Sequence, residues 1–199
     1  MPDTSPTKWH LAHTSWAFET FVLKPFNKTY EEFNAEYNFL FNSYYESVGP
    51  RNQRPKRGLL SRPALKDVHA YRRHVDDAME ALIHDAGERA WGEIRSFVDL
   101  ANNHEQQHQE LMLTDIKHVF SCNPLKPAYR PKIPAAIGAG SDTDVTGPSP
   151  VSWIEFPEGL VEAGHDFSAS PNFAYDNEGP RHKVWMDGFR IAGRPVSNG

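Results

Sequence analysis

Residues 94–119 read IRSFVDLANNHEQQHQELMLTDIKHV, and this stretch decides the fold of the chain. Apolar or histidine side chains recur in it at steps of three and four residues, which is the spacing of one face of an α-helix. The pattern predicts a long amphipathic helix over about 88–120, which the prolines of 123–134 end. The inward face of this helix carries His104 and His108, one turn apart.

Two further helices are predicted nearer the N-terminus. Residues 8–24 carry apolar or histidine side chains at helical spacing, and Ser5-Pro6 is expected to start this helix as its cap and first turn. Residues 66–84 show the same spacing, whereas 27–45 are aromatic and polar and fit either a helix or a structured loop. Together these elements predict an α-helical bundle.

The composition changes after residue 134. Residues 135–150 are rich in Gly, Ser, Thr, Asp and Pro, as expected of a linker, and 151–199 contain short β segments separated by turn residues. We therefore predict a helical metal-binding domain over 1–134, a linker over 135–150, and the N-terminal part of a β-rich domain over 151–199. Because so few residues of strand cannot close a core, we expect the chain to be a fragment of a longer protein.

Composition and charge exclude several classes of protein. The 199 residues include 21 basic and 26 acidic ones, a net charge of −5, which disfavours a strongly basic nucleic-acid binder. The sequence offers neither an apolar run long enough to cross a bilayer nor the blocks of a signal peptide. Its one cysteine, Cys122, cannot form an internal disulfide, in keeping with a reducing compartment. We predict a cytoplasmic protein that binds neither nucleic acid nor membrane.

Histidines from two of the predicted helices are candidates for a metal site. His104 and His108 face inward, and His13 lies on the inward face of the first helix. Three buried imidazoles without partners would leave ring nitrogens unsatisfied at about 1–3 kcal/mol each, so a bound cation is favoured. His10, about 60° off the same face, could replace His13 or act outside the ligand set. The alternative is a binding module without enzymatic activity, in which hydrogen-bonded core histidines only stabilise the bundle.

Residues 104–108 also match H-E-x-x-H, the zinc-protease helix in which the glutamate is the general base. The extended form of this motif requires glycine and a third histidine where this chain has Leu111 and Thr114. The chain after residue 120 predicts no further helix that could present a carboxylate ligand. The sequence therefore disfavours a metalloprotease.

Several stretches resemble a known enzyme family. SPTKWHLAHTSWAFETF (5–21), RNQRPKRGLLSRP (51–63) and NHEQQHQELMLTDIKH (103–118) resemble the DinB-like N-terminal helical domain of the ergothioneine-biosynthesis sulfoxide synthases, the EgtB family. FPEGLVEAGHDF (156–167) and the residues from 173 onward are similar to the opening of their formylglycine-generating-enzyme-like (sulfatase-modifying-factor) domain. The resemblance implies a mainly α fold, a DinB-like bundle followed by an incomplete β-rich (α+β) segment.

The family implies a non-haem Fe(II) oxidoreductase of the hercynine oxygenase type. Such enzymes use O₂ to join the sulfur of γ-glutamylcysteine or cysteine to C2 of the imidazole of Nα-trimethylhistidine (hercynine), forming a sulfoxide. By this resemblance the Fe(II) ligands are His13, His104 and His108, and Gln107 helps to hold the imidazole substrate. Three neutral imidazoles would leave positions open on the metal for thiolate, substrate imidazole and O₂.

The segment 51–73 holds eight basic residues and one acidic residue. Although such a run is usually a solvated face, alignment with the family favours Arg51 and Arg54 as the residues that bind the carboxylates of the thiol substrate. The catalytic tyrosine of the family is expected beyond Gly199. We therefore expect this polypeptide alone to bind Fe(II) weakly and to show little or no sulfoxide synthase activity.

Alternative functions of two kinds remain open. Ovothiol and selenoneine synthases share the architecture, and their substrate choice depends on residues that this chain lacks. A DinB-like metal-dependent thiol transferase would instead bind zinc or nickel and act without O₂. The sequence identifies neither the sulfur donor nor the oligomeric state.

Overall fold

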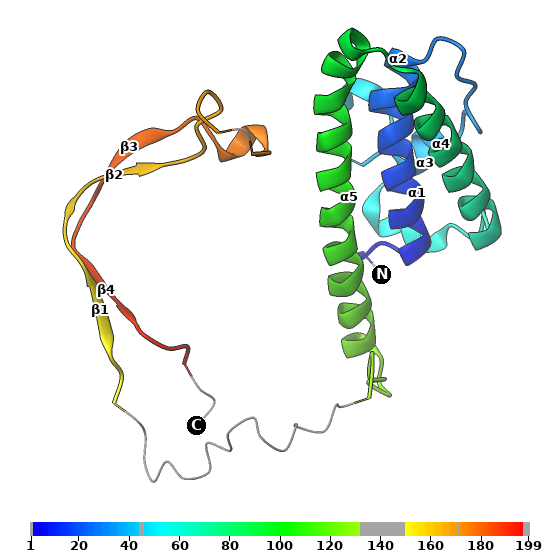
Figure 1. The fold of residues 1–199 in the computed structure, drawn as a ribbon. Helices are drawn as coiled ribbons and strands as arrows, with labels where there is room; N and C mark the ends of the chain where they lie inside the picture. The colour runs from blue at the N-terminus through cyan, green and yellow to red at the C-terminus, as the bar shows by residue number, and fades with distance from the viewer. Residues whose placement is uncertain (1, 44–45, 132–149, 171, 197–199) are drawn as a thin grey trace. The chain divides into compact units, whose positions relative to one another are not determined.

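The computed structural model describes residues 2–43, 46–131, 150–170 and 172–196, and the chain divides into two units after Pro131 (Figure 1). We call the described residues up to 131 the helical unit and those from 150 the β unit. The chain is mainly helical with a small β segment, which confirms the predicted fold class. The predicted linker lies, apart from its last residue, outside the described residues, and the predicted domain boundaries remain predictions.

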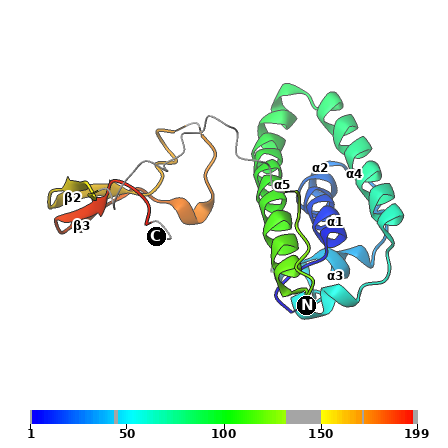
Figure 2. The ribbon, with the colours of Figure 1, turned by 90° about the horizontal axis from the view of Figure 1, so that it is seen from below.

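Helix α1 (Thr7–Phe18) is the central element of the helical unit. It lies between α4 (Leu65–Asp85) and α5 (Glu88–Cys122) and contacts both of them (Figures 1 and 2). A helix enclosed in this way has few side chains that can remain in water. Most side chains of α1 are accordingly buried, namely Trp9, His10, Ala12, His13, Thr14, Ser15, Trp16 and Ala17.

The two long helices agree with the helices predicted over 66–84 and 88–120. In α5 the buried side chains are Ile94, Val98, Ala101 and His108, which lie on a single face as the apolar periodicity indicates. Much of the rest of α5 is exposed. Within the described residues, no helix combines the length and the apolar character that crossing a bilayer would require.

The start of α1 differs from the prediction that Ser5 caps it. Pro6 occupies the cap position in an extended conformation, and its carbonyl accepts a hydrogen bond from the N–H of Trp9 at 2.8 Å. Ser5 bonds instead to residues far along the chain: its N–H donates to Asp115 Oδ2 at 2.9 Å, and its hydroxyl accepts from Arg57 at 3.0 Å. These tertiary partners replace the local capping bond.

The predicted first helix continues past α1 through a π-helical turn, Glu19–Leu23, into the short helix α2 (Lys24–Phe26). Glu19 in the wider turn is buried, and its carboxylate accepts hydrogen bonds from the hydroxyls of Tyr30 and Tyr71, each at 2.6 Å. Burial, and also the Glu19 charge, raise the pKa of both tyrosines. The carboxylate is therefore satisfied inside the core.

The segment for which the sequence left helix and loop open contains one short helix, α3 (Tyr37–Phe41), which contacts α1. The indole N–H of Trp16 donates to Asn38 Oδ1 at 2.8 Å, and that of Trp9 donates to the Leu40 carbonyl at 2.9 Å. These bonds fix two large side chains of α1 against α3. Two 3₁₀ helices, Glu46–Val48 and Arg54–Leu59, connect this region to α4.

The β unit consists of paired strands, in agreement with the β segments predicted from the sequence. Strand β1 (Trp153–Phe156) pairs antiparallel with β4 (Phe189–Ala192), and β2 (Gly159–Ala163) pairs antiparallel with β3 (His182–Met186). A 3₁₀ helix, Asp176–Glu178, lies between β2 and β3. Because each sheet has only two strands, many apolar side chains are exposed, including Trp153, Ile154, Leu160, Trp185 and Ile191.

Candidate metal centre

The structure brings together the three histidines that the sequence singled out. One potential ligand atom from each of His13, His104 and His108 lies within 4.8 Å of the other two. The imidazole rings are 4.5–5.0 Å apart between centroids. His13 comes from α1 and the other two from successive turns of α5, so the contact between these helices assembles the triad. His13 and His108 are buried, whereas His104 is partly exposed.

The orientation of His13 is fixed by its surroundings. Its ring is stacked on Trp9 at 4.6 Å and on Trp16 at 5.4 Å between centroids, with both indoles nearly parallel to it. Nδ1 of His13 lies 2.6 Å from the carbonyl oxygen of Phe41. A carbonyl can only accept, so this nitrogen carries the proton and Nε2 retains its lone pair. The sequence placed His13 beside the two tryptophans, but its acceptor on α3 had no local signal.

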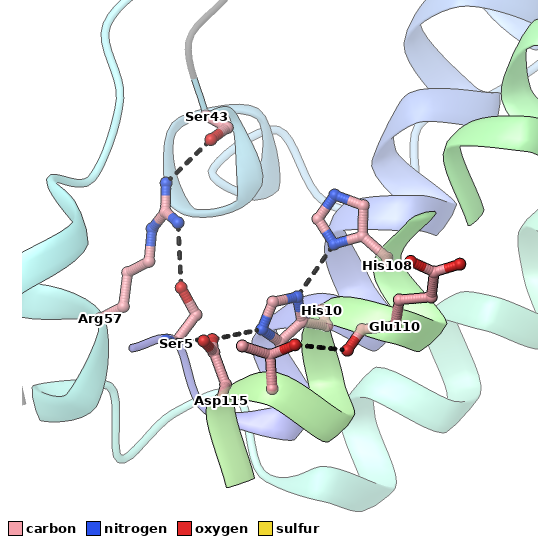
Figure 3. A network of polar contacts seen from close by, with 8 residues as sticks. Ser5, His10, Ser43, Arg57, His108, Glu110 and Asp115 are labelled. Carbon is pink, nitrogen blue, oxygen red and sulfur yellow. Dashed lines mark hydrogen bonds and ion pairs between the residues drawn. The ribbon is translucent and has the colours of Figure 1, made fainter. Parts of the chain in front are cut away.

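His108 is held by a second imidazole. Its Nδ1 lies 2.9 Å from Nδ1 of His10, and Nε2 of His10 lies 3.0 Å from Oδ2 of Asp115 (Figure 3). His10 was a candidate to replace His13 in the ligand set. The structure instead places His10 behind His108, where His10 contacts Asp115 of α5, the helix that carries His108. His10 does not belong to the triad.

All of these imidazoles favour the neutral form. Burial, then the neighbouring His108 and His104, hold the pKa of His13 well below its usual range, and burial also lowers that of His104. Burial, His104, His10 and two nearby arginines lower the pKa of His108 to about 3. Burial lowers the pKa of His10, although Asp115 opposes this shift. Neutral imidazole is the form that binds metal ions.

The donor set fits a divalent transition-metal ion. Imidazole nitrogen suits zinc, copper, iron and nickel, and three such ligands leave further coordination positions for other groups. At bond lengths of about 2.1 Å, two ligand atoms stand at most about 4.2 Å apart. The ligand atoms of the triad lie within 4.8 Å of one another, so the rings need to move by less than about 1 Å to bind one ion. His13 and His108 each have Nδ1 engaged, which leaves Nε2 for the ion.

The basic residues that the family resemblance favoured have different environments. The charge of Arg54 contributes to the lowered pKa of His108, so this residue lies near the triad. Its Nε is buried and has no hydrogen-bond partner within the described part of the chain. Arg51 donates from Nη1 to the carbonyl of Ser43 at 2.6 Å.

Arg57 is a basic residue of this region that the sequence analysis did not single out. It is 2% exposed, lies 3.5 Å above the ring of Trp9, and donates to the hydroxyls of Ser5 and Ser43 (Figure 3). Its charge also lowers the pKa of His108. Its spacing of three residues from Arg54, which places both on one side of a 3₁₀ helix, is the signal that could have identified it.

Two further residues of α5 that the sequence analysis considered are Gln107 and Glu105. Gln107 is exposed on α5, one residue before His108. Glu105, the glutamate of the H-E-x-x-H match, pairs with Arg72 of α4 at 2.9 Å. Arg72 also donates to the carbonyl of Leu11 and the hydroxyl of Thr14, so Glu105 takes part in joining three helices. This role supports the sequence argument against a metalloprotease.

The fold and the triad define a helical unit with a three-histidine site suited to a metal ion. Over 201 residues, the chain is 32% identical to hercynine oxygenase from Mycolicibacterium thermoresistibile. The similarity covers 99% of this chain and 40% of the relative, so the chain spans about two fifths of the relative's length. No protein-family model matches the chain. The similarity therefore extends through both units.

Proposed function

We propose that this chain belongs to the hercynine oxygenase family and forms the metal-binding part of an oxidoreductase of that type. One observation carries the proposal: a buried, neutral three-histidine cluster lies in a chain that is similar to a hercynine oxygenase over almost its whole length. Three neutral nitrogen ligands without a carboxylate suit an iron(II) site that retains open positions. The domain names that the sequence suggested, DinB-like and formylglycine-generating-enzyme-like, belong to the same proposal.

The proposed reaction joins the sulfur of a thiol, γ-glutamylcysteine or cysteine, to C2 of the imidazole of hercynine and yields a sulfoxide. O₂ is the oxidant. Fe(II) bound at the triad would supply the redox chemistry by which O₂, thiol and imidazole react. The polypeptide supplies the binding and the orientation of these small molecules.

The residues of this chain have distinct roles in the proposal. His13, His104 and His108 hold the metal, and the indoles stacked on His13 exclude water from one side of the site. Arg54 and Arg57 add positive charge near the triad, which favours an anionic thiol and its carboxylates. Arg51 and Gln107 remain proposed substrate-binding residues. Because His104 is the partly exposed member of the triad, we propose that substrate approaches from its side.

Spectroscopic titration of the chain loaded with cobalt(II) tests the substrate class. Adding cysteine or γ-glutamylcysteine under anaerobic conditions is expected to produce a thiolate-to-cobalt charge-transfer band, and serine serves as the control without a thiol. Arg54→Gln should require more thiol without weakening cobalt binding, because the Arg54 charge attracts the thiol and no atom of Arg54 is a proposed metal ligand. A cobalt spectrum that neither thiol alters would contradict the proposal.

The same titration identifies the sulfur donor, because the preferred thiol saturates the band at the lower concentration. Hercynine added beside the thiol, or histidine added in its place, is expected to change the spectrum further, because either imidazole can take an open position on the metal. The cytoplasmic location stays a prediction from the sequence.

A further inference from the structure

A partly buried series of hydrogen bonds lies behind the triad. The Asp115 carboxylate accepts from the backbone N–H of Ser5 at 2.9 Å and lies 3.0 Å from Nε2 of His10. Nδ1 of His10 then lies 2.9 Å from Nδ1 of His108, so this series of hydrogen bonds ends on a member of the triad (Figure 3). It joins the N-terminus of α1 to α5, the same two helices that carry the triad.

The chemistry of these groups fixes where the protons lie. An ionised carboxylate only accepts hydrogen bonds, so Nε2 of His10 donates to Asp115. A neutral His10 then has its lone pair on Nδ1 and must accept from Nδ1 of His108. His108 consequently carries its proton on Nδ1 and has its lone pair on Nε2, the nitrogen that faces away from His10.

The opposite arrangement is incompatible with a metal ion at the triad. If His10 donated from Nδ1, a neutral His108 would carry its proton on Nε2, where the metal must bind. Water has little access with which to rearrange these protons, because His10 is 1% exposed and the Asp115 side chain is 13% exposed. The hydrogen-bond chain thus holds the tautomer that metal binding needs.

We propose that His10 and Asp115 are positioning residues that set the tautomer and ring orientation of His108 for metal binding. The inference rests on the proposed metal site and adds two residues outside the ligand set. The tautomer of His13 is fixed in a similar way, because the Phe41 carbonyl accepts a hydrogen bond from its Nδ1. Within the described residues, the His104 ring has no such hydrogen-bond acceptor, which makes it an internal reference.

Nitrogen NMR of the metal-free chain, labelled with ¹⁵N-histidine, measures the proposal directly. Long-range ¹H–¹⁵N correlations distinguish an imidazole protonated at Nδ1 from one protonated at Nε2. In the wild type we expect His108 protonated at Nδ1 and His10 at Nε2, each as a single tautomer, while His104 is a mixture. His108 protonated at Nε2 in the wild type would overturn the proposal.

Variants connect the tautomer to metal binding. His10→Phe removes the acceptor and Asp115→Leu removes the group that orients it, so both should give a tautomer mixture at His108. Both should also weaken zinc(II) binding by about 10–100-fold. His10→Asn offers an amide oxygen near the position of Nδ1, and it should restore the tautomer and most of the affinity. Asp99→Asn, an exposed carboxylate of α5, is the matched control and should change neither.

The outcomes separate this inference from the proposed function. An unchanged His108 tautomer, or unchanged zinc affinity, in both His10→Phe and Asp115→Leu would overturn the positioning role. Should His10→Phe not fold, as judged by circular dichroism, Asp115→Leu carries the same test because Asp115 lies nearer the surface. A wild-type chain with the expected tautomers but no metal binding would support the hydrogen-bond chain and contradict the proposed function.

Discussion

The helical unit and the β unit contain similar kinds of apolar side chains, but they differ in how far they bury them. Trp9 and Trp16 are almost fully buried, and their indole N–H groups have acceptors on α3. Trp153 and Trp185 in the β unit are each 58% exposed. Three contacting helices enclose a core, whereas two-stranded pairings satisfy the backbone and leave both faces uncovered. A preorganised site is therefore expected in the helical unit.

Replacing a tryptophan in each unit should give the largest contrast. Trp16→Ala removes a fully buried ring that stacks on His13, and it should lower the free energy of unfolding of the helical unit by about 3–5 kcal/mol. Trp185→Ala removes an exposed ring and should change the free energy of unfolding of the β unit by less than about 0.5 kcal/mol. Urea unfolding followed by circular dichroism measures both. Equal effects would mean that the two side chains are equally buried in solution.

As the pH falls, the metal-free helical unit should begin to lose stability at a higher pH than the β unit does. Unfolded histidines take up protons below their ordinary pKa of 6.5, whereas folded His108 does so only near about 3. The unfolded state then binds more protons, so stability falls as the pH decreases through this window. In the β unit the hydrogen bonds of Ser168 lower the pKa of Asp166, and that contribution is lost only below about the ordinary carboxyl pKa of 3.8. Urea midpoints at several pH values measure this dependence, and midpoints that stay constant from neutral pH to about pH 4 would contradict it.

Ion pairs should give the smallest contrast. Arg72 pairs with Glu105 at 2.9 Å and donates two further hydrogen bonds to α1, so Arg72→Met should cost about 1–2 kcal/mol. Arg181 pairs with Glu162 at the same distance, but both side chains are half exposed. Arg181→Met should therefore cost less than about 0.5 kcal/mol. A larger loss for Arg181→Met in thermal unfolding would reverse the ranking of the two units.

Local spacing made much of the helical unit predictable. The helices and the inward faces of His104 and His108 follow from steps of three and four residues, and the strands of the β unit follow from short apolar segments between turns. The π-helical turn after Phe18 did not follow, because its buried Glu19 depends on the hydroxyl of Tyr71, 52 residues away.

The hydrogen-bond partners of the site were beyond the reach of local patterns. His10 and His13 differ little on a helical wheel, and what separates them is a carboxylate 105 residues away for His10 and a carbonyl 28 residues away for His13. Arg57 lies in a basic run of the kind that is usually solvated, yet serine hydroxyls and an indole ring surround it. The ligand assignment itself stays a prediction.

Iron quantification after anaerobic loading tests the central claim most directly. The wild type should bind one iron(II) per chain when iron(II) is saturating. His13→Ala, His104→Ala and His108→Ala should each weaken this binding at least about tenfold. His182→Ala, an exposed histidine of β3, is the matched control and should load as the wild type does. Loading that survives all three substitutions of the triad would contradict the metal centre described above.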